Sequence, residues 1–397
     1  MGSLGTASLG SALPLVKMPE VDYGPDQDEM VRYRAEGTRK ALAMDNRGPI
    51  RFDADGTLSQ DILDAYWKHG FYVFEGVLKA DELDDLERDV VELLDRAPVT
   101  KGADLDRHGR PALGADSGSK HISWVRPLSD PLGGTAAANG RHPAKMSEPT
   151  PPEGAPDWVV QVISGSLQYS DACLRTYGHP DLMRVTEAVN GPDFTPFNEV
   201  VWIKAPRLGG SVAWHQDPWT HWDSPEMGPG THGFNYMAQL YGCDAENGLW
   251  VVPGSHAAGK VDIKAIVDGI GSDRLPDAVP LICAPGDVAI ANRQAIHGSF
   301  ANTSGNPRVT INFGFHRRSS VLNVTSGGVH NPITTYTDEH IFERSKVIGY
   351  AINARAERFP DETAYDYAPF SARMDEFAWT DEARDSLKGY NNGDLGI

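Results

Sequence analysis

Residues 211–217 read SVAWHQD, a strand-like run that ends in His215, Gln216 and Asp217. On a β-strand, side chains two positions apart point to the same face, so His215 and Asp217 can direct an imidazole and a carboxylate at one point. Such a pair supplies two ligands of a facial triad, in which two histidines and one carboxylate hold iron and leave adjacent positions open. A histidine and an aspartate at this spacing also occur by chance, so the interpretation needs a third ligand from a distant strand.

The candidate third ligand is His297, which begins a second run, HGSFAN, at residues 297–302. Arg308 follows, at the start of the strand-like segment RVTIN. An arginine at this place could bind the carboxylate of a ligand through its bidentate fork. Alternatively, Arg308 could be a surface strand residue that pairs with an acidic side chain.

Short strand-like runs continue on both sides of these residues, separated by turns that contain Pro-Gly and Asn-Gly. Strands of this length and spacing are typical of a sandwich or barrel such as a jelly roll. We therefore predict a mainly β fold with flanking helices, whose core occupies residues 195–318. The predicted strands are residues 199–205, 211–214, 234–241, 249–252, 287–291 and 308–315.

Helical patterns precede this core. Gly70 lies where a helix that ends at about His69 needs a residue tolerant of positive φ. The run FYVF at residues 71–74 predicts a strand, and apolar residues at three- and four-residue steps in residues 83–93 predict an amphipathic helix. Helical periodicity resumes after residue 157, between about Trp158 and Val189, so we assign residues 58–190 to a helical N-terminal part.

The chain is expected to form one domain with extensions at both ends. We assign residues 51–320 to the domain, residues 1–50 to an extension that is partly disordered or lies on the domain, and residues 321–397 to a C-terminal helical extension. The insert 101–157 is rich in Gly, Pro, Asp and Ser and too long for a connector, which indicates either disorder or a functional flap.

Composition limits the classes of partner. The formal charge of −19 would repel polyanions, which excludes nucleic acid and anionic membranes as expected partners and favours a small molecule.

The three cysteines are widely spaced, so neither a disulfide framework nor a thiolate zinc site is indicated. The sequence shows no signal peptide pattern and no apolar run of about 18 residues, so we expect a cytoplasmic protein. A homodimer is compatible with this sequence.

Taken together, these motifs resemble the phytanoyl-CoA dioxygenase family, a branch of the iron(II)- and 2-oxoglutarate-dependent oxygenases built on a double-stranded β-helix. The resemblance covers about residues 58–316, and its blocks occur in the family's order. These blocks are YWKHGFYV at 66–73, WHQD at 214–217, NGLWVVPGSH at 247–256, and His297-Gly298-Ser299 with Asn302 and Arg308.

The resemblance implies a role for five residues. His215, Asp217 and His297 would bind Fe(II), Arg308 would receive the distal carboxylate of 2-oxoglutarate, and Ser299 would donate a hydrogen bond to that carboxylate. The implied reaction uses O2 to oxidise a C–H bond of a small organic substrate, by hydroxylation, desaturation or cyclisation. A role in secondary metabolism would fit this chemistry.

Two details of the motifs refine the expectation. Related halogenases carry Ala or Gly in place of the carboxylate, so Asp217 disfavours halogenation. The histidine of the PGSH block, His256, is not a ligand in the family, and we expect it to have a structural role.

The motifs do not identify the substrate. Lys204, Arg207, Arg317 and Arg318 could bind a substrate carboxylate or lie in solvent, and we favour solvent. A coenzyme A thioester is disfavoured because we find no dense basic patch. Aromatic residues that could line an apolar pocket, or could equally be core, are Trp219, His221, Trp222, Trp250, Phe313 and Phe315.

Two other classes of function stay open from the sequence. A cupin-like, metal-dependent hydrolase or isomerase could use zinc on a similar jelly roll, and it would not need Arg308. A catalytically dead binding module could keep the fold, although an intact triad argues against it.

Overall fold

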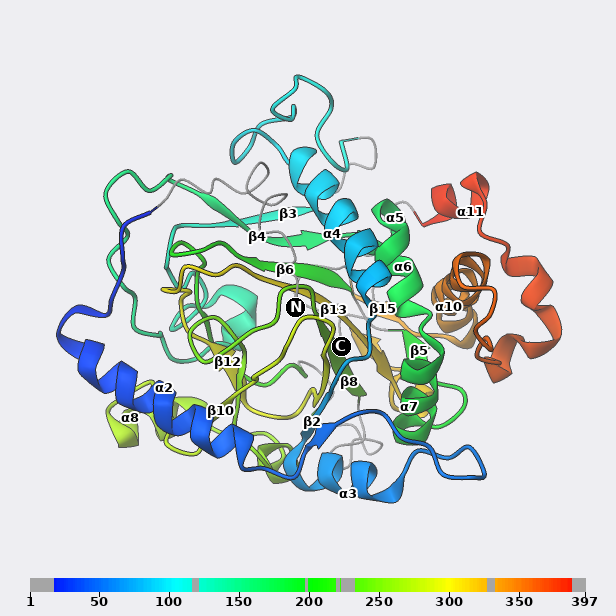
Figure 1. Ribbon diagram of the computed structural model, residues 1–397, viewed down its shortest axis with the longest axis horizontal. Helices are drawn as coiled ribbons and strands as arrows, with labels where there is room; N and C mark the ends of the chain where they lie inside the picture. Colours follow the sequence, from blue (N-terminus) through cyan, green and yellow to red (C-terminus); the bar gives the residue numbers. More distant parts are fainter. Residues whose placement is uncertain are drawn as a thin grey trace.

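The computed structural model describes residues 18–115, 121–196, 199–218, 222, 233–326 and 333–387 (Figure 1). Within these residues the chain forms a nine-stranded sheet, a four-stranded sheet and a short hairpin. The strands are β1 (Arg47–Gly48), β2 (Phe71–Phe74), β3 (Ile122–Val125), β4 (Val159–Ser164), β5 (Thr195–Pro196), β6 (Val200–Lys204), β7 (Val212–His215), β8 (Gly233–Gln239), β9 (Trp250–Val251), β10 (Val279–Pro280), β11 (Val288–Asn292), β12 (His297–Ser299), β13 (Arg308–His316), β14 (Thr325–Ser326) and β15 (Thr334–Thr335).

The two main sheets are built from strands that lie far apart in the sequence. The large sheet has the order β1-β2-β11-β8-β13-β6-β4-β3, with β5 also paired to β13, and the small sheet has the order β10-β9-β12-β7. All the predicted strands of the 195–318 region are present, with ends shifted by one or two residues at most sites. Strand β2 occupies residues 71–74, as the aromatic run predicts.

Helices pack against both sheets. They are η1 (Gly24–Asp26), α2 (Gln27–Leu42), α3 (Gln60–His69), α4 (Ala80–Asp95), η2 (Ala137–Gly140), α5 (Ser166–Tyr169), α6 (Asp171–Tyr177), α7 (Pro180–Asn190), η3 (Ser255–Ala258), α8 (Ile263–Ile270), α9 (Arg318–Val321), α10 (Asp338–Arg358), η4 (Ala368–Phe377) and α11 (Asp381–Ser386). Helix α3 ends at His69, and Gly70 adopts the predicted positive φ of 79°.

The prediction of a mainly β protein needs correction. Helices make up 36% of the structure and strands 19%. The excess of helix comes largely from segments outside the strand-rich core, because α2 precedes it, α4 to α7 lie in the N-terminal part and α10 follows it. Sheets flanked by helices are confirmed, but the β part is the smaller one.

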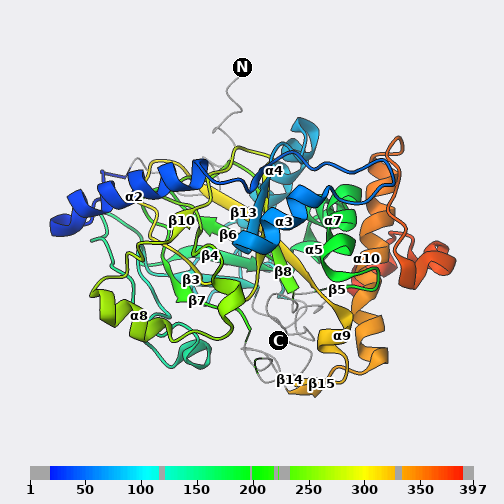
Figure 2. The same cartoon turned by 90° about the horizontal axis from the view of Figure 1, so that it is seen from below.

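The helices lie on opposite sides of the sheets. Figures 1 and 2 show α6, α7 and α10 on one side and α2 with α8 on the other. The first group buries the main hydrophobic cluster against the large sheet, with Leu174, Val185 and Val347 fully buried. Such a cluster fixes the large sheet, whose strand β13 carries Arg308.

Helix α2 shows that part of the predicted N-terminal extension belongs to the fold. The ring of Tyr33 stacks on Trp250 of β9 with centroids 4.5 Å apart, and Gly37 lies against the same indole. Within residues 18–50, helix α2 therefore packs on the four-stranded sheet. Residues 1–17 lie outside the described residues.

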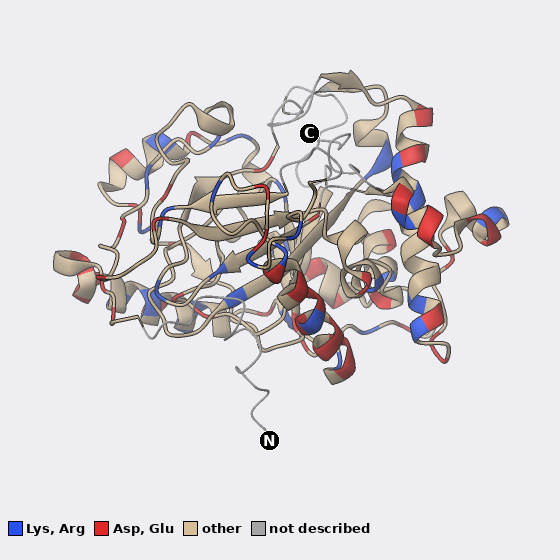
Figure 3. Ribbon diagram, turned by 90° about the horizontal axis from the view of Figure 1, so that it is seen from above, with Lys and Arg blue, Asp and Glu red and all other residues tan. Residues whose placement is uncertain are grey.

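Charged residues lie mainly on the helices and loops and rarely on the strands. In Figure 3 the strands are almost entirely free of charged positions, which concentrate on helices and loops. In the part of the chain that the structure describes, no helix has both the length and the apolar character that crossing a bilayer requires.

Candidate metal centre

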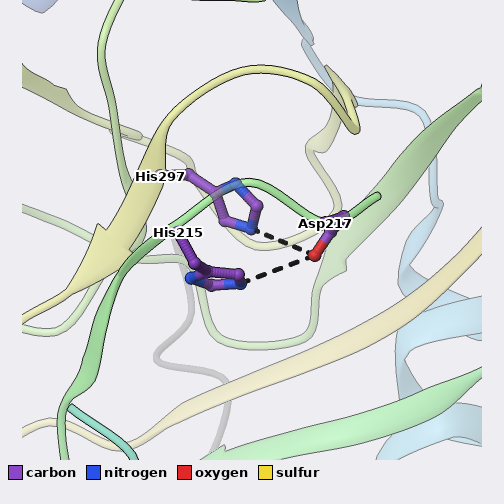
Figure 4. A group of neighbouring side chains, drawn as sticks. All are labelled: His215, Asp217 and His297. Atoms are coloured by element: carbon purple, nitrogen blue, oxygen red, sulfur yellow. Dashed lines mark ion pairs between the residues drawn. The ribbon is translucent and has the colours of Figure 1, made fainter. Parts of the chain in front are cut away.

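Strands β7 and β12 bring the two predicted histidine ligands together. The strands are antiparallel neighbours, and His297 is the direct partner of His215 in their register. Asp217 lies just beyond the end of β7 and turns back towards both rings (Figure 4). The carboxylate Oδ1 of Asp217 is 3.5 Å from Nε2 of His215 and 3.7 Å from Nε2 of His297. One ligand atom from each residue lies within 4.8 Å of the others, so the group could hold a metal ion.

Hydrogen bonds to backbone carbonyls fix the orientation of the two imidazole rings. Nδ1 of His215 donates to the carbonyl of Ala213 at 2.8 Å, and Nδ1 of His297 donates to the carbonyl of Ala295 at 3.0 Å. With Nδ1 bound to a carbonyl, each ring turns its Nε2 towards Asp217. Burial, with the nearby ring of His215, lowers the pKa of His297 to about 4, so His297 is neutral at pH 7.

Two residues that the sequence did not single out orient Asp217. Asn235 of β8 donates from Nδ2 to Oδ2 of Asp217 at 2.8 Å, and Nε of the buried Arg293 is 3.7 Å from the same oxygen. Burial alone would raise the pKa of Asp217, but the neighbouring His297, His215 and Arg293 hold it well below its usual range. Asp217 is therefore ionised, with Oδ2 anchored and Oδ1 facing the histidines.

A second group of buried polar atoms lies on β12 and β13. Arg308 donates from Nη1 to the carbonyl of Asn247 at 3.1 Å, while its Nε has no partner. Oγ of Ser299 is also buried without a partner. Among the described residues, no carboxylate lies within 4.0 Å of the Arg308 guanidinium, so the alternative of a surface arginine paired with an acid is wrong. Burial lowers the pKa of Arg308 to about 10, which leaves it charged at neutral pH.

Lys204 of β6 corrects a further expectation. The sequence favours a solvent-exposed position for this residue, but its side chain is fully buried, directly opposite Arg308 in the β6–β13 register. Its Nζ donates to the carbonyl of Phe300, the residue after Ser299. Burial, with the nearby guanidinium groups of Arg308 and Arg34, holds the pKa of Lys204 well below its usual range.

The other candidate cations have protein partners. Arg207 donates to the carbonyl of Met18 at 3.0 Å, and Arg317 donates to the carbonyl of Val189 at 3.3 Å. Arg318 forms ion pairs with Asp193 and Asp338. These contacts are structural and lend no support to a substrate-binding role.

The aromatic candidates for a substrate pocket separate into three groups. Trp250 is fully buried and donates from Nε1 to the carbonyl of Ala245 at 3.2 Å, which are the contacts of a core residue. Phe313 and Phe315 pack on Tyr177 in the main cluster. Trp222 is half-buried and donates from Nε1 to the carbonyl of Pro218 at 3.1 Å. Trp219 and His221 lie outside the described residues.

His256 has the contacts expected of a structural residue. Its Nε2 donates to the carbonyl of Trp67 at 3.0 Å, and its ring packs directly on Gly70, where an added Cβ would lie 2.5 Å from Nδ1. It thus joins η3 to the end of α3.

The insert 101–157 reaches the candidate metal centre through Arg141 and His142, which the sequence did not identify. Nη1 of Arg141 donates to the backbone carbonyl of Asp217 at 2.7 Å. The ring of His142 lies 4.2 Å, centroid to centroid, from the ring of His215. The only available signal was the presence of a histidine and an arginine in a long insert, and hydrophobic periodicity cannot locate such loop contacts.

Comparison with known proteins agrees with the motifs. The sequence model of the family described as phytanoyl-CoA dioxygenase (PhyH) matches residues 66–310. No curated protein matches the chain.

Similar solved structures include AviO1 from Streptomyces viridochromogenes Tue57, at 22% identity over 63% of this chain and 91% of that chain, with a TM-score of 0.44. Another is EctD from S. alaskensis with 2-oxoglutarate and 5-hydroxyectoine, at 19% identity over 69% of this chain and 81% of that chain, with a TM-score of 0.47. A third is SnoN, an alpha-ketoglutarate-dependent epimerase from nogalamycin biosynthesis, at 18% identity over 63% of this chain and 77% of that chain, with a TM-score of 0.42.

Proposed function

Because the chain belongs to the phytanoyl-CoA dioxygenase family, we propose that it is an iron(II)- and 2-oxoglutarate-dependent oxygenase that oxidises a C–H bond of a small organic substrate. The observation that carries this proposal is the convergence of His215, Asp217 and His297, whose ligand atoms lie within 4.8 Å of one another. Two imidazoles and one carboxylate form the donor set that non-haem iron(II) oxygenases use.

The buried polar atoms of β12 and β13 fit the co-substrate. Oγ of Ser299 and Nε of Arg308 are buried donors without an acceptor, and an unsatisfied buried donor costs about 1–3 kcal/mol. A carboxylate that reached both atoms would satisfy them and would neutralise the arginine, which has no acidic partner among the described residues. We assign this pair to the distal carboxylate of 2-oxoglutarate.

In the proposed reaction, iron(II), 2-oxoglutarate and O2 together supply the oxidising power, with succinate and carbon dioxide as co-products. The protein would hold the metal ligands in position. The carbonyls of Ala213 and Ala295 hold each imidazole with Nε2 facing inward, and Asn235 holds the Asp217 carboxylate. Hydroxylation is the default outcome, while desaturation or cyclisation would need only a different placement of the substrate.

We also propose that the core is a double-stranded β-helix within a single oxygenase domain, residues 51–320. Support comes from the four antiparallel strands β10-β9-β12-β7 and from the neighbouring antiparallel strands β11, β8, β13 and β6 of the large sheet. The protein would act in the cytoplasm on a small-molecule substrate of secondary metabolism, and a homodimer is compatible with this role.

The two other classes of function are less well supported. A zinc-dependent cupin hydrolase or isomerase would give no role to the unsatisfied Nε of Arg308 and Oγ of Ser299. A binding module without activity would not need the three inward-facing ligand atoms.

Succinate formation tests the proposal. Anaerobically purified protein is supplied with iron(II), 2-oxoglutarate and O2, and succinate is measured with and without candidate substrates. We expect succinate in an iron-dependent manner and, before O2 is added, an absorption band that needs both iron and 2-oxoglutarate. A well-folded protein that gives neither succinate nor the band under any condition would contradict the proposal.

A further inference from the structure

Two consecutive residues of the insert 101–157 lie beside the candidate metal centre. Arg141 is held by its hydrogen bond to the carbonyl of Asp217, and the ring of His142 lies against the ring of His215 with an angle of 38° between their planes. Both follow η2, so neither belongs to the four-stranded sheet whose strands β7 and β12 carry the histidine ligands. The insert thus adds a polar wall to a site that is otherwise built from strands.

This part of the insert is fixed by hydrogen bonds of its own. The Asp130 carboxylate accepts from the backbone N–H groups of Gly133 at 2.9 Å and Met146 at 3.0 Å. The N–H of Gly134 donates to the carbonyl of His142 at 2.9 Å. Because the loop is closed on itself on both sides of residues 141 and 142, their side chains are placed before any ligand binds, which reduces the entropy cost of binding.

Both side chains keep unsatisfied polar atoms in buried positions. His142 is 2% exposed, and its Nδ1 has no hydrogen-bond partner. Nε of Arg141 is likewise buried without a partner, and no carboxylate among the described residues lies within 4.0 Å of its guanidinium. A guanidinium fork and an imidazole next to each other can together receive the two oxygens of one carboxylate.

The charge balance favours an anion from a second molecule. Under the proposed function, one carboxylate of 2-oxoglutarate would bind the metal through one of its oxygens and the other would bind Arg308 and Ser299, so the co-substrate could offer Arg141 at most one further oxygen. The Asp217 carboxylate is occupied by Asn235 and the two histidines. An anion that presents two oxygens, one to Arg141 and one to His142, would therefore come from the organic substrate; a loss of 2-oxoglutarate affinity in Arg141→Gln would instead assign Arg141 to the metal-bound carboxylate of the co-substrate.

We infer that the substrate is a carboxylic acid whose carboxylate is bound by Arg141 and His142 beside the metal centre. This inference rests on the proposed function. It places the oxidised carbon within reach of the metal while the acid group is held by the insert, and it makes these two residues determinants of substrate specificity.

Paramagnetic relaxation tests the inference with a readout other than activity. The protein is loaded with Mn(II) and 2-oxoglutarate, and the proton relaxation of benzoate is compared with that of benzamide, which has nearly the same shape but no charge. Benzoate should relax faster in the wild type. Arg141→Gln should weaken benzoate binding about tenfold, the equivalent of one charge-assisted hydrogen bond, and leave benzamide unchanged.

Variants in the same insert complete the design. His142→Phe keeps a ring against His215 but removes Nδ1, and it should reduce the preference for benzoate. Arg126→Gln changes an exposed arginine of the insert and should not affect the preference.

The outcomes separate the two proposals. Normal binding of Mn(II) and 2-oxoglutarate with equal relaxation of the two probes, or a benzoate preference that survives Arg141→Gln, would overturn the inference and leave the proposed function standing. Failure of Mn(II) and 2-oxoglutarate to bind would overturn both.

Discussion

The side chain of Asp217 has two distinct sets of neighbours, and the difference between its two oxygens defines the candidate site. Oδ2 accepts a hydrogen bond from Asn235, whereas Oδ1 faces Nε2 of His215 and His297. A carboxylate anchored on one oxygen presents the other in a fixed direction, which is how neighbouring groups usually orient a metal ligand.

Loss of a ligand should remove activity and spare the fold. We expect His215→Ala and Asp217→Ala to abolish iron-dependent succinate formation, because each removes one of three metal ligands. Melting temperature should stay close to the wild-type value, since the ligands lie at a site and not in the packed core. His108→Gln, which changes a largely exposed histidine next to Asp95, is the matched control. Activity that survives both alanine variants would remove these residues from the metal centre.

Arg308 and Ser299 should affect the co-substrate and not the metal. We expect Arg308→Gln to weaken 2-oxoglutarate binding by about 10- to 100-fold, the equivalent of about 1.5–3 kcal/mol for hydrogen bonds to a charged group. Ser299→Ala should have a smaller effect without loss of stability, because its Oγ has no partner to lose. Calorimetric titration of 2-oxoglutarate into the Mn(II)-loaded protein measures both effects.

A control arginine makes the Arg308 result specific. Arg318→Gln removes a cation that pairs with Asp193 and Asp338, and it should leave the affinity for 2-oxoglutarate unchanged. If Arg308→Gln also left that affinity unchanged, Arg308 would have no part in the site.

Among the elements, strands β7 and β12 set the position of the site, and helix α2 supports the sheet that they form. Tyr33 of α2 stacks on Trp250 of β9, which is the neighbour of β12. The helix approaches closely because Gly37 has no side chain at the contact, where an added Cβ would lie 2.5 Å from the Trp250 ring.

A methyl group at residue 37 should therefore be costly. We expect Gly37→Ala to destabilise the protein by about 1–3 kcal/mol, the usual range for overpacking a core, as measured by urea unfolding. The matched control is Gly269→Ala in α8, where the added Cβ meets open space. That change should be neutral or stabilising by up to about 1 kcal/mol, because alanine restricts the unfolded chain. Equal effects of the two substitutions would show that α2 does not pack as described.

The elements also show what the sequence could predict and what it could not. Strand β2 and the end of α3 were predictable because an aromatic run and Gly70 are local signals. Helix α2 gave no such signal, since its buried face consists of Met30, Arg34, Gly37 and Ala41, which is not an apolar stripe.

In the candidate site, too, the residues with a local sequence signal could be predicted and the others could not. His215 and Asp217 lie two positions apart, and the family motif supplied His297, so their meeting could be predicted. Asn235, Arg141 and His142 reach the site only through tertiary contacts, and no spacing in the sequence indicates such contacts.

At the scale of the whole molecule, buried histidines couple stability to pH. Burial, with the nearby Arg355 and Lys79, holds the pKa of His179 well below its usual range, and burial lowers the pKa of His256 in the same direction. Each is neutral in the folded protein, whereas the unfolded chain takes up a proton below about pH 6.5. Stability should therefore fall as the pH drops below that value, by up to about 1.4 kcal/mol per pH unit for each such histidine.

Urea unfolding of the metal-free protein at pH 7.5 and pH 5.5 measures this dependence. His179→Asn should reduce the loss of stability between the two pH values, because asparagine cannot take up the proton. Asparagine is also a favourable N-cap, so it can replace the hydrogen bond that His179 accepts from the N–H of Asp181 at the start of α7. A pH dependence that is identical in both proteins would contradict the assignment of His179.

The most direct test of the metal centre is the position of the metal itself, located by anomalous scattering in a crystal of the protein with Mn(II) and 2-oxoglutarate. We expect one ion bound by Nε2 of His215, a carboxylate oxygen of Asp217 and Nε2 of His297, with 2-oxoglutarate chelating it and reaching Arg308. An ion found elsewhere, or one enclosed by a fourth protein ligand such as His142, would contradict the account.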